Sequence, residues 1–371
     1  MKKYIPFLAL ILMASPAFAI ETAAKQAFIV DDGTNTVLFS KNGDEKMHPS
    51  SMSKLMTVYI VFNRLKEGSV KLADTLPVSE KAWRLQGSKS FVELGAHISI
   101  DDLLKGIIIQ SGNDACMVVA EGLAGSEEAF AAQMNDMAKK LGLSNSHFAN
   151  PHGLSDPNHL MSAHDLAILA HHVIHDFPEY YHYFSEKEFV YHGIRQGNRN
   201  LLLYKDLGVD GLKTGHTDEG GYGMVVSAKD KSGRRELVVV NGLGSEKERA
   251  EEAERLLAFA FRDFENVTVL HKGEVIEQAN VWFGDKKQVA LTAADDVVLT
   301  LPKVGRDKLK ITLSYTDPVP APIKQGEHIA DLKIESENAP VQIVPLVASE
   351  SVDKLHGIKR IIRTLVYYVS G

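Results

Sequence analysis

The chain has 371 residues, of which 44% are hydrophobic and 24% are charged, a composition typical of folded globular protein and not of disordered chain. The length predicts two domains, and the formal net charge of −7 argues against a nucleic-acid partner. A single cysteine, Cys116, excludes an intramolecular disulfide, so the cysteine count does not identify the compartment.

The N-terminal segment, residues 1–19, has the three parts of an export signal. Two lysines follow the first methionine, an apolar run covers residues 5–13, and Ala17-Phe18-Ala19 offers small residues to a signal peptidase. A permanent membrane helix is disfavoured because the apolar run is too short to span a bilayer. We therefore expect cleavage after Ala19 and an exported mature chain that begins at Ile20.

Residues 20–265 combine short strands with helices. Hairpin signals occur at Asp32-Gly33 and at residues 230–233, each between two apolar runs. Strands are expected near 222–229 and 235–243, and helices near 51–66, 99–109, 114–123, 126–141, 163–176 and 246–264. This pattern predicts an α+β domain in which helices flank an antiparallel sheet.

The texture of the sequence changes after residue 265. Short apolar runs such as VTVL, QVAL and KITLSY alternate with turn residues, and no useful helical pattern returns before the tail. We therefore expect a small all-β domain, a β-sandwich, over residues 266–350.

The last segment, residues 351–371, predicts an amphipathic helix. Its apolar stripe consists of Leu355, Ile358, Ile361, Ile362, Leu365, Val366 and Val369, and its basic residues are Lys354, Lys359, Arg360 and Arg363. Such a helix suits the interface of an anionic bilayer but is not apolar enough to span one. We expect it to anchor the exported protein to the periplasmic face of the inner membrane. The alternative is a terminal helix that packs on its own domain.

One short stretch, PSSMSKLMT at residues 49–57, suggests a nucleophile with its base. Ser50 and Ser51 lie four and three residues before Lys54, so in a helix either hydroxyl could share a face with the lysine. Spacing alone does not choose between the two serines, and it does not exclude a helix start that is merely rich in serine.

Three short sequence patterns indicate a catalytic site only when their order along the chain and their positions relative to helices and strands are considered together. Ser51–Lys54 opens a helix, Ser111-Gly-Asn113 falls between two helices, and Lys213-Thr-Gly215 precedes a strand. Competing matches look structural, since Lys231-Ser-Gly233 is a hairpin turn and Ser351 would cap the tail helix.

In this order the three elements resemble the signature of penicillin-binding proteins and serine β-lactamases. The stretches QSGNDAC (110–116), SNSHFANPHGL (144–154) and VDGLKTGHTDEGGYG (209–223) are similar to the low-molecular-mass D-alanyl-D-alanine carboxypeptidases of peptidase family S11. The layout of export signal, catalytic domain, β domain and anchor also resembles that family, and the likeness covers essentially the whole mature chain. No Glu-x-x-Leu-Asn segment, typical of class A β-lactamases, lies between Ser111 and Lys213.

The resemblance implies a β-lactamase/transpeptidase-like catalytic domain and a serine carboxypeptidase. Such an enzyme removes the terminal D-alanine from peptidoglycan pentapeptides through an acyl-enzyme, and β-lactams acylate the same serine. No metal or organic cofactor is implied. Alternatives are a β-lactamase or DD-endopeptidase on the same scaffold, or a catalytically silent module that binds the wall. The partner of the β domain is left open.

The resemblance also assigns roles. Ser51 is the nucleophile and Lys54 its general base, which requires a lysine pKa lowered by about 3 units, or about 4 kcal/mol. Burial and a second cation can do this, and Lys213 is the expected cation. Ser111 relays a proton to the departing D-alanine, and the amide of Asn113 holds the substrate peptide.

The remaining assignments concern substrate binding. The backbone of Thr214, Gly215 and His216 pairs with the extended substrate, and one of its N–H groups joins that of Ser51 in an oxyanion hole. Thr214, with Arg199 or Arg249, grips the terminal carboxylate. Each arginine could equally be a surface or interdomain charge.

Two further features have simpler interpretations. His171 and His175 have the spacing of a metal pair, but no third ligand is evident, so a solvated helix face is favoured. Cys116 is expected to pack inside a buried helix, close enough to the site for thiol reagents to inhibit.

Overall fold

The computed structural model describes residues 2–6, 20–304, 310–336 and 339–357. The chain divides into two compact units, Ala19–Arg262 and a second unit made of Met1–Phe18 with Asp263–Gly371.

A five-stranded antiparallel sheet, in the order β3-β2-β10-β9-β8, forms the centre of the larger unit. Its strands are β2 (Gln26–Asp31), β3 (Thr36–Lys41), β8 (Val209–Thr217), β9 (Gly221–Lys229) and β10 (Arg235–Leu243). The two hairpin turns predicted from sequence join β2 to β3 and β9 to β10. The strand β8, which carries Lys213-Thr-Gly215, lies at the edge of the sheet.

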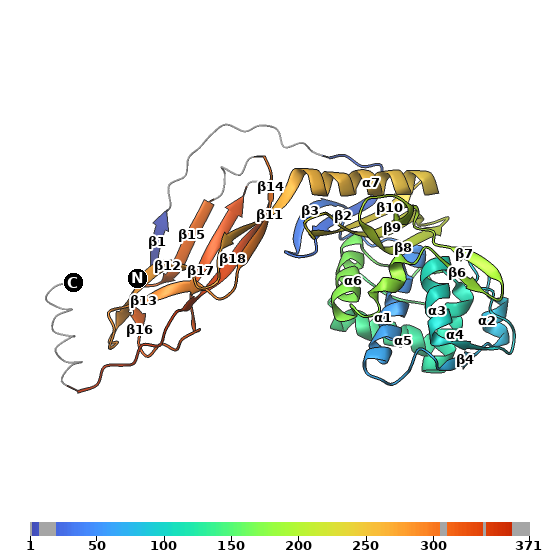
Figure 1. The fold of residues 1–371 in the computed structure, drawn as a ribbon, viewed down its shortest axis with the longest axis horizontal. Coiled ribbons are helices and arrows are strands. Elements are labelled where there is room, and N and C mark those ends of the chain that lie inside the picture. The colour runs from blue at the N-terminus through green and yellow to red at the C-terminus, as the bar shows by residue number, and fades with distance from the viewer. Residues whose placement is uncertain (1, 7–19, 305–309, 337–338, 358–371) are drawn as a thin grey trace. The chain divides into compact units, whose positions relative to one another are not determined.

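Helices cover both faces of this sheet, which is why the middle of β10 is a continuous buried apolar run (Figure 1). On one face lies α7 (Glu246–Asp263), and the other helices gather on the opposite face. These helices and short helical turns are η1 (Ser50–Ser53), α1 (Lys54–Lys66), α2 (Glu80–Arg84), α3 (Ile100–Lys105), η2 (Gly106–Gln110), α4 (Asn113–Ala124), α5 (Glu127–Lys140), α6 (Ala163–Asp176), η3 (Tyr181–Ser185) and η4 (Leu201–Tyr204). Two small ribbons, β4 (Thr75–Pro77) with β5 (His97–Ser99) and β6 (Glu188–Tyr191) with β7 (Ile194–Gly197), complete the unit. The predicted antiparallel sheet with flanking helices is confirmed.

Serine caps set the starts of several helices. Ser99, Ser126 and Ser162 each accept a hydrogen bond from the backbone N–H three residues on, at 3.1, 3.1 and 3.0 Å. The helix expected over 99–109 is α-helical to Lys105 and then widens into the π-helical turn η2. That turn ends at Ser111, whose backbone is left-handed with φ +66°.

The smaller unit is all-β, as predicted. Its strands are β1 (Lys2–Pro6), β11 (Phe264–Leu270), β12 (Val275–Trp282), β13 (Gln288–Ala293), β14 (Val297–Pro302), β15 (Lys310–Thr316), β16 (Val319–Pro320), β17 (His328–Ser336) and β18 (Ala339–Ala348). One sheet has the order β1-β15-β17-β18-β13-β12-β16 and β11 pairs with β14 in another, and both contribute to one apolar core. The edge strand β1 lies within the expected export signal, so cleavage after Ala19 would remove it.

The start of the expected tail helix differs from the prediction. Ser351 accepts a hydrogen bond from the backbone N–H of Gln325 at 2.9 Å, and Val352 and Lys354 form isolated bridges to Ile323 and Gly284. Ser351 therefore does not cap a helix, because this segment is still part of the β domain. Residues 358–371, like residues 7–19 of the expected export signal, lie outside the described part. Within the described part, no helix has the length and apolarity needed to cross a membrane.

Candidate active site

The structure distinguishes the two serines that spacing left equivalent. Ser51 lies in the 3₁₀ turn η1, and its Oγ is 2.8 Å from Nζ of Lys54, the first residue of α1. Ser50 has a left-handed backbone with φ +51°, and its Oγ lies 2.8 Å from Oγ1 of Thr217. The Ser50 hydroxyl therefore turns toward β8. Ser51 is half-buried, whereas Lys54 is fully buried.

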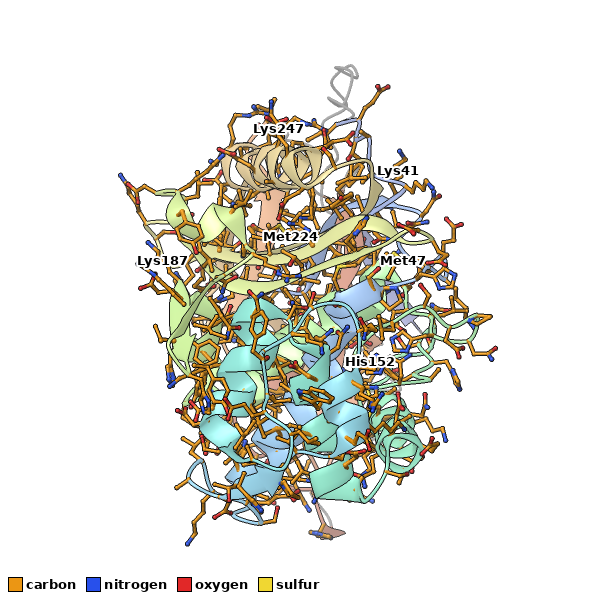
Figure 2. All side chains as sticks on the ribbon, turned by 90° about the vertical axis from the view of Figure 1, so that its right-hand side faces the viewer. Lys41, Met47, His152, Lys187, Met224 and Lys247 are labelled. Atoms are coloured by element: carbon orange, nitrogen blue, oxygen red, sulfur yellow. The ribbon has the colours of Figure 1, made fainter. Side chains whose placement is uncertain are left out.

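The Lys54 ammonium has three acceptors, one for each of its protons. They are Ser51 Oγ at 2.8 Å, Asn113 Oδ1 at 2.8 Å and the backbone carbonyl of His152. The carbonyl belongs to a tight turn that Asn150 holds, because its Oδ1 accepts the N–H of Gly153 at 2.7 Å. Figure 2 shows His152 on the helical side of the sheet.

Burial lowers the pKa of Lys54 to about 8, since the charged form loses its hydration in the interior. The Arg199 guanidinium lowers this pKa further, while Cys116 and Asp114 act in the opposite direction. Lys213 is the second cation expected from the sequence. Lys54 and Lys213 repel each other, which helps to lower the pKa of Lys213, and Arg199 is a further cation that favours neutral Lys54.

Ser111 and Asn113 lie where η2 meets α4. The Ser111 hydroxyl is buried and has no hydrogen-bond partner within the described residues. Asn113 makes two contacts through its amide: Oδ1 accepts from Lys54, and Nδ2 donates to the carbonyl of Gln86 at 2.8 Å. An Asn amide has two N–H donors and two lone pairs, so these contacts are compatible with the expected contact with a substrate. A side chain at Gly112 would put its Cβ 1.9 Å from Ser90 Oγ, so the loop requires glycine.

The edge strand β8 lies directly against η1. A Cβ at Gly215 would be 2.8 Å from the carbonyl oxygen of Pro49, so only glycine permits this approach. Lys213 and Thr214 are buried, and Lys213 Nζ donates to the Thr214 carbonyl at 3.2 Å. Burial, Lys54 and Arg199, in that order, place the pKa of Lys213 well below its ordinary value. His216 is exposed and stacks on Tyr222 with ring centroids 3.8 Å apart.

Neither arginine is an ordinary surface charge. Arg199 is half-buried and donates to Ser88 Oγ at 2.7 Å. Arg249 is 3% exposed, donates to Glu246 Oε1 at 2.8 Å and lies over the Tyr222 ring. Both guanidinium groups lower the pKa of Lys213. The site therefore concentrates positive charge in a poorly hydrated setting, which favours an anionic ligand.

Sequence reasoning missed the residues that hold the His152 turn, whose backbone carbonyl accepts a hydrogen bond from Lys54. His152 Nε2 lies 3.0 Å from Glu127 Oε1, and Glu127 Oε2 lies 2.9 Å from Lys81 Nζ. The sequence did contain a signal for His152, because the stretch SNSHFANPHGL (144–154) is similar to the family, but no role was assigned to its residues.

Cys116 is fully buried, and burial raises the pKa of its thiol to about 11, so the native thiol is shielded from reagents. The histidine pair at 171 and 175 does have a third partner, Asp32, outside this site.

Comparison with known proteins finds matches over most of the chain. The family model of peptidase S11, described as D-alanyl-D-alanine carboxypeptidase, matches residues 13–244, and that of the penicillin-binding protein 5 C-terminal domain matches residues 264–354. D-alanyl-D-alanine carboxypeptidase DacC of Escherichia coli is 39% identical over 360 residues, covering 93% of this chain and 90% of that protein. DacA of Haemophilus influenzae is 38% identical over 314 residues, covering 83% and 80%. The crystal structure of penicillin-binding protein 5 from Haemophilus influenzae superimposes with a TM-score of 0.83 at 35% identity, covering 91% of this chain and all of that one.

Proposed function

Because this chain belongs to the peptidase S11 family of D-alanyl-D-alanine carboxypeptidases, we propose that it removes the terminal D-alanine from peptidoglycan stem peptides through an acyl-enzyme on Ser51. The observation that carries the proposal is the set of three acceptors around Lys54. Asn113 Oδ1 and the His152 carbonyl can only accept hydrogen bonds. When Lys54 loses one proton, its two remaining N–H groups stay hydrogen-bonded to Asn113 Oδ1 and the His152 carbonyl. The nitrogen lone pair then points at the Ser51 hydroxyl.

The first chemical step is acylation. Neutral Lys54 takes the proton of Ser51 as Oγ attacks the carbonyl carbon of the penultimate D-alanine. The negative oxygen of the tetrahedral intermediate is bound by the N–H of Ser51 and an N–H of β8. The C–N bond then breaks, the leaving amine receives a proton by way of Ser111, and an ester on Ser51 remains. Water hydrolyses this ester and regenerates the serine. A β-lactam enters by the same route, with its amide bond opening in place of the D-Ala-D-Ala bond.

Substrate binding uses the free edge of β8 and the cations around it. An extended stem peptide adds as a further strand beside Thr214–His216. Its terminal carboxylate lies among Thr214, Lys213 and Arg199 or Arg249, where charge-assisted hydrogen bonds are strong because little water competes. The buried position of Lys213 and Arg249 supports this assignment.

The place of action follows from the two ends of the chain. Export through residues 1–19 delivers the enzyme to the periplasm, where peptidoglycan is found. The basic amphipathic segment 354–371 binds the anionic surface of the inner membrane. Deleting residues 358–371 tests this, since the truncated protein is expected in the soluble periplasmic fraction. A truncated protein that stays with the membrane would refute the anchor.

Penicillin labelling with intact mass spectrometry tests the nucleophile. Wild-type protein is expected to gain one penicilloyl adduct that peptide mapping places on Ser51, and Ser51→Ala is expected to gain none. Ser50→Gly is the matched control, because glycine accepts the left-handed backbone at this position. An adduct on Ser50, or equal labelling of Ser51→Ala, would disprove the assignment. Release of D-alanine from a pentapeptide, compared with turnover of a chromogenic cephalosporin and of cross-linked muropeptides, separates carboxypeptidase from β-lactamase and endopeptidase.

A further inference from the structure

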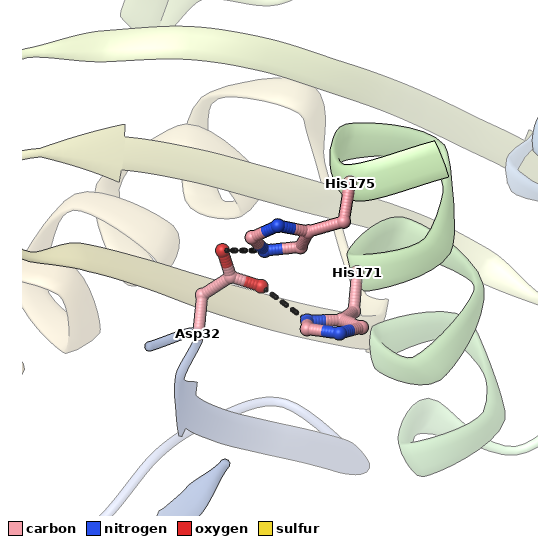
Figure 3. Close-up of side chains that lie close together, drawn as sticks. All are labelled: Asp32, His171 and His175. Carbon is pink, nitrogen blue, oxygen red and sulfur yellow. Dashed lines mark hydrogen bonds and ion pairs between the residues drawn. The ribbon is translucent and has the colours of Figure 1, made fainter. Parts of the chain in front are cut away.

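Three side chains that lie far apart in the sequence meet beside α6 (Figure 3). Asp32 follows β2 directly, and His171 and His175 lie one turn apart on the helix. Asp32 Oδ1 lies 2.8 Å from His171 Nδ1, and Asp32 Oδ2 lies 2.8 Å from His175 Nε2. The three candidate ligand atoms all lie within 4.8 Å of one another.

This cluster is separate from the serine site. Asp32 donates its backbone N–H to the carbonyl of Arg235 at 2.9 Å, at the first residue of β10. Lys213–Gly215 lies two strands away on β8, and its Thr214 pairs with Met224, which pairs with Val240 near the other end of β10. The cluster therefore shares no residue with the serine site and occupies the opposite end of the sheet.

We propose that Asp32, His171 and His175 bind one divalent transition-metal ion, of which Zn²⁺ is the best match. Two imidazole nitrogens and one carboxylate oxygen are a common zinc donor set, and three protein ligands leave a fourth position for water. A tetrahedral ion with bonds of about 2.0–2.2 Å separates its ligand atoms by about 3.3 Å, so each ring has to move outward by roughly half an ångström. The histidine side chains are 31% and 50% exposed, which allows this movement.

The charges around the cluster favour a cation. Asp32 is 3% exposed, and each of its carboxylate oxygens faces an imidazole nitrogen at 2.8 Å. The competing cation is Arg235, whose Nε lies 3.9 Å from Asp32 Oδ2. Its guanidinium is already bound by both carboxylate oxygens of Asp210, at 2.8 and 2.7 Å. The Asp32 carboxylate therefore remains available to a metal ion held by the two histidines.

A metal ion would take the place of the two N–H protons that face Asp32. The two imidazole rings lie only 4.3 Å apart, each with one nitrogen directed at an oxygen of this carboxylate. One ion bound to both nitrogens and to a carboxylate oxygen would use all three ligand groups at once. Because Asp32 lies at the β2–β3 turn, the bound ion would link this hairpin to α6 and stabilise the folded state.

Calorimetric titration of metal-stripped protein with ZnCl₂ tests the proposal. We expect one ion per chain with a dissociation constant tighter than on the order of 100 μM, and an increase of several degrees in Tm at saturating metal. His171→Gln and His175→Gln each remove one ligand and are expected to weaken this binding roughly tenfold or more. The substituted side chains are partly exposed, so both variants should fold.

His172→Gln is the matched control. His172 lies on the same helix, but its Nδ1 lies 3.0 Å from Asp176 and not from Asp32. This variant should leave the Zn²⁺ affinity unchanged. It controls for adventitious binding to histidines outside the cluster, since the chain has 15 histidines in total. No binding at 100 μM metal, or equal binding by wild type and His175→Gln, would overturn the proposal. Loss of affinity in His172→Gln alone would assign the ion to a different site.

Discussion

Ser51 and Lys54 meet across a change of helix type: the serine lies in the 3₁₀ turn η1, the lysine begins α1, and Oγ and Nζ are 2.8 Å apart. The other two acceptors of Lys54 come from α4 and from the turn at His152. The lysine is thus fixed by three separate segments of the chain. The fold therefore determines the position of the Lys54 amine as well as its pKa.

The pH dependence of acylation should report the titration of Lys54. Because burial lowers its pKa to about 8, roughly a tenth of the enzyme carries neutral Lys54 at pH 7. The neutral form is the base, so the rate of acylation by benzylpenicillin should rise with pH and level off above a midpoint near 8. Stopped-flow measurements from pH 6 to 10, with circular dichroism as a control for folding, check this. A rate that is constant between pH 7 and 9 would show that Lys54 is not the titrating base.

Removing the charge of Arg199 should move that midpoint upward. Its guanidinium favours neutral Lys54, so Arg199→Gln should raise the Lys54 pKa by roughly 0.5–1 unit and slow acylation at pH 7 by roughly 3- to 10-fold. Arg199→Lys keeps the charge and serves as the control. Arg199 could also bind the β-lactam carboxylate, and the full pH profile separates the two effects. Loss of binding lowers the plateau, whereas loss of the electrostatic effect shifts the midpoint.

Much of the fold was predictable because its signals are local. Helix α6 was predicted near 163–176 and the structure places it at Ala163–Asp176, since Ser162 caps a strongly periodic segment. The π-helical turn before Ser111 was not predictable. In this turn Gly106 approaches Ser90 so closely that an added Cβ would lie 2.4 Å from Ser90 Oγ, a long-range contact that helical periodicity does not encode.

The site was predictable where a resemblance named residues and less so where long-range contacts decide. Arg199 was assigned only to the substrate carboxylate, yet its guanidinium also lowers the Lys54 pKa. Asp32 was not recognised as a partner of His175 because 143 residues separate them. The topology of the sheet, and not any sequence spacing, brings them together.

Gly215→Ala should separate β8 from η1. The added Cβ would lie 2.8 Å from the Pro49 carbonyl oxygen and 3.1 Å from Ser50 Cβ, so one backbone segment has to shift. We expect the acylation rate to fall by about 100-fold, because this shift displaces the oxyanion donors, and the free energy of unfolding to fall by about 1–3 kcal/mol. Gly197→Ala on β7 is the control, since the nearest atom to its added Cβ, Tyr204 Oη, would be 3.6 Å away. Wild-type acylation by Gly215→Ala would mean that the close approach is not needed.

Glu127→Gln should loosen the turn at His152, whose backbone carbonyl accepts a hydrogen bond from Lys54. The hydrogen bond from His152 and the contact with Lys81 hold the pKa of Glu127 at about 2, below its ordinary value of 4.5. A carboxylate with a depressed pKa stabilises the folded state fully above pH 4.5, and this contribution is lost as the pH falls through 2. Burial keeps the pKa of His152 low despite Glu127, so a neutral imidazole donates through Nε2.

Urea unfolding of Glu127→Gln should therefore show a loss of about 1–2 kcal/mol at pH 7, and a smaller loss at pH 3. Acylation should slow several-fold, because the His152 carbonyl that holds Lys54 loses its support. Glu128→Gln, at the exposed neighbouring position, should change neither quantity appreciably. An equal loss of stability at both pH values would point to a packing effect, and unchanged acylation would show that the turn holds its carbonyl in place without the carboxylate.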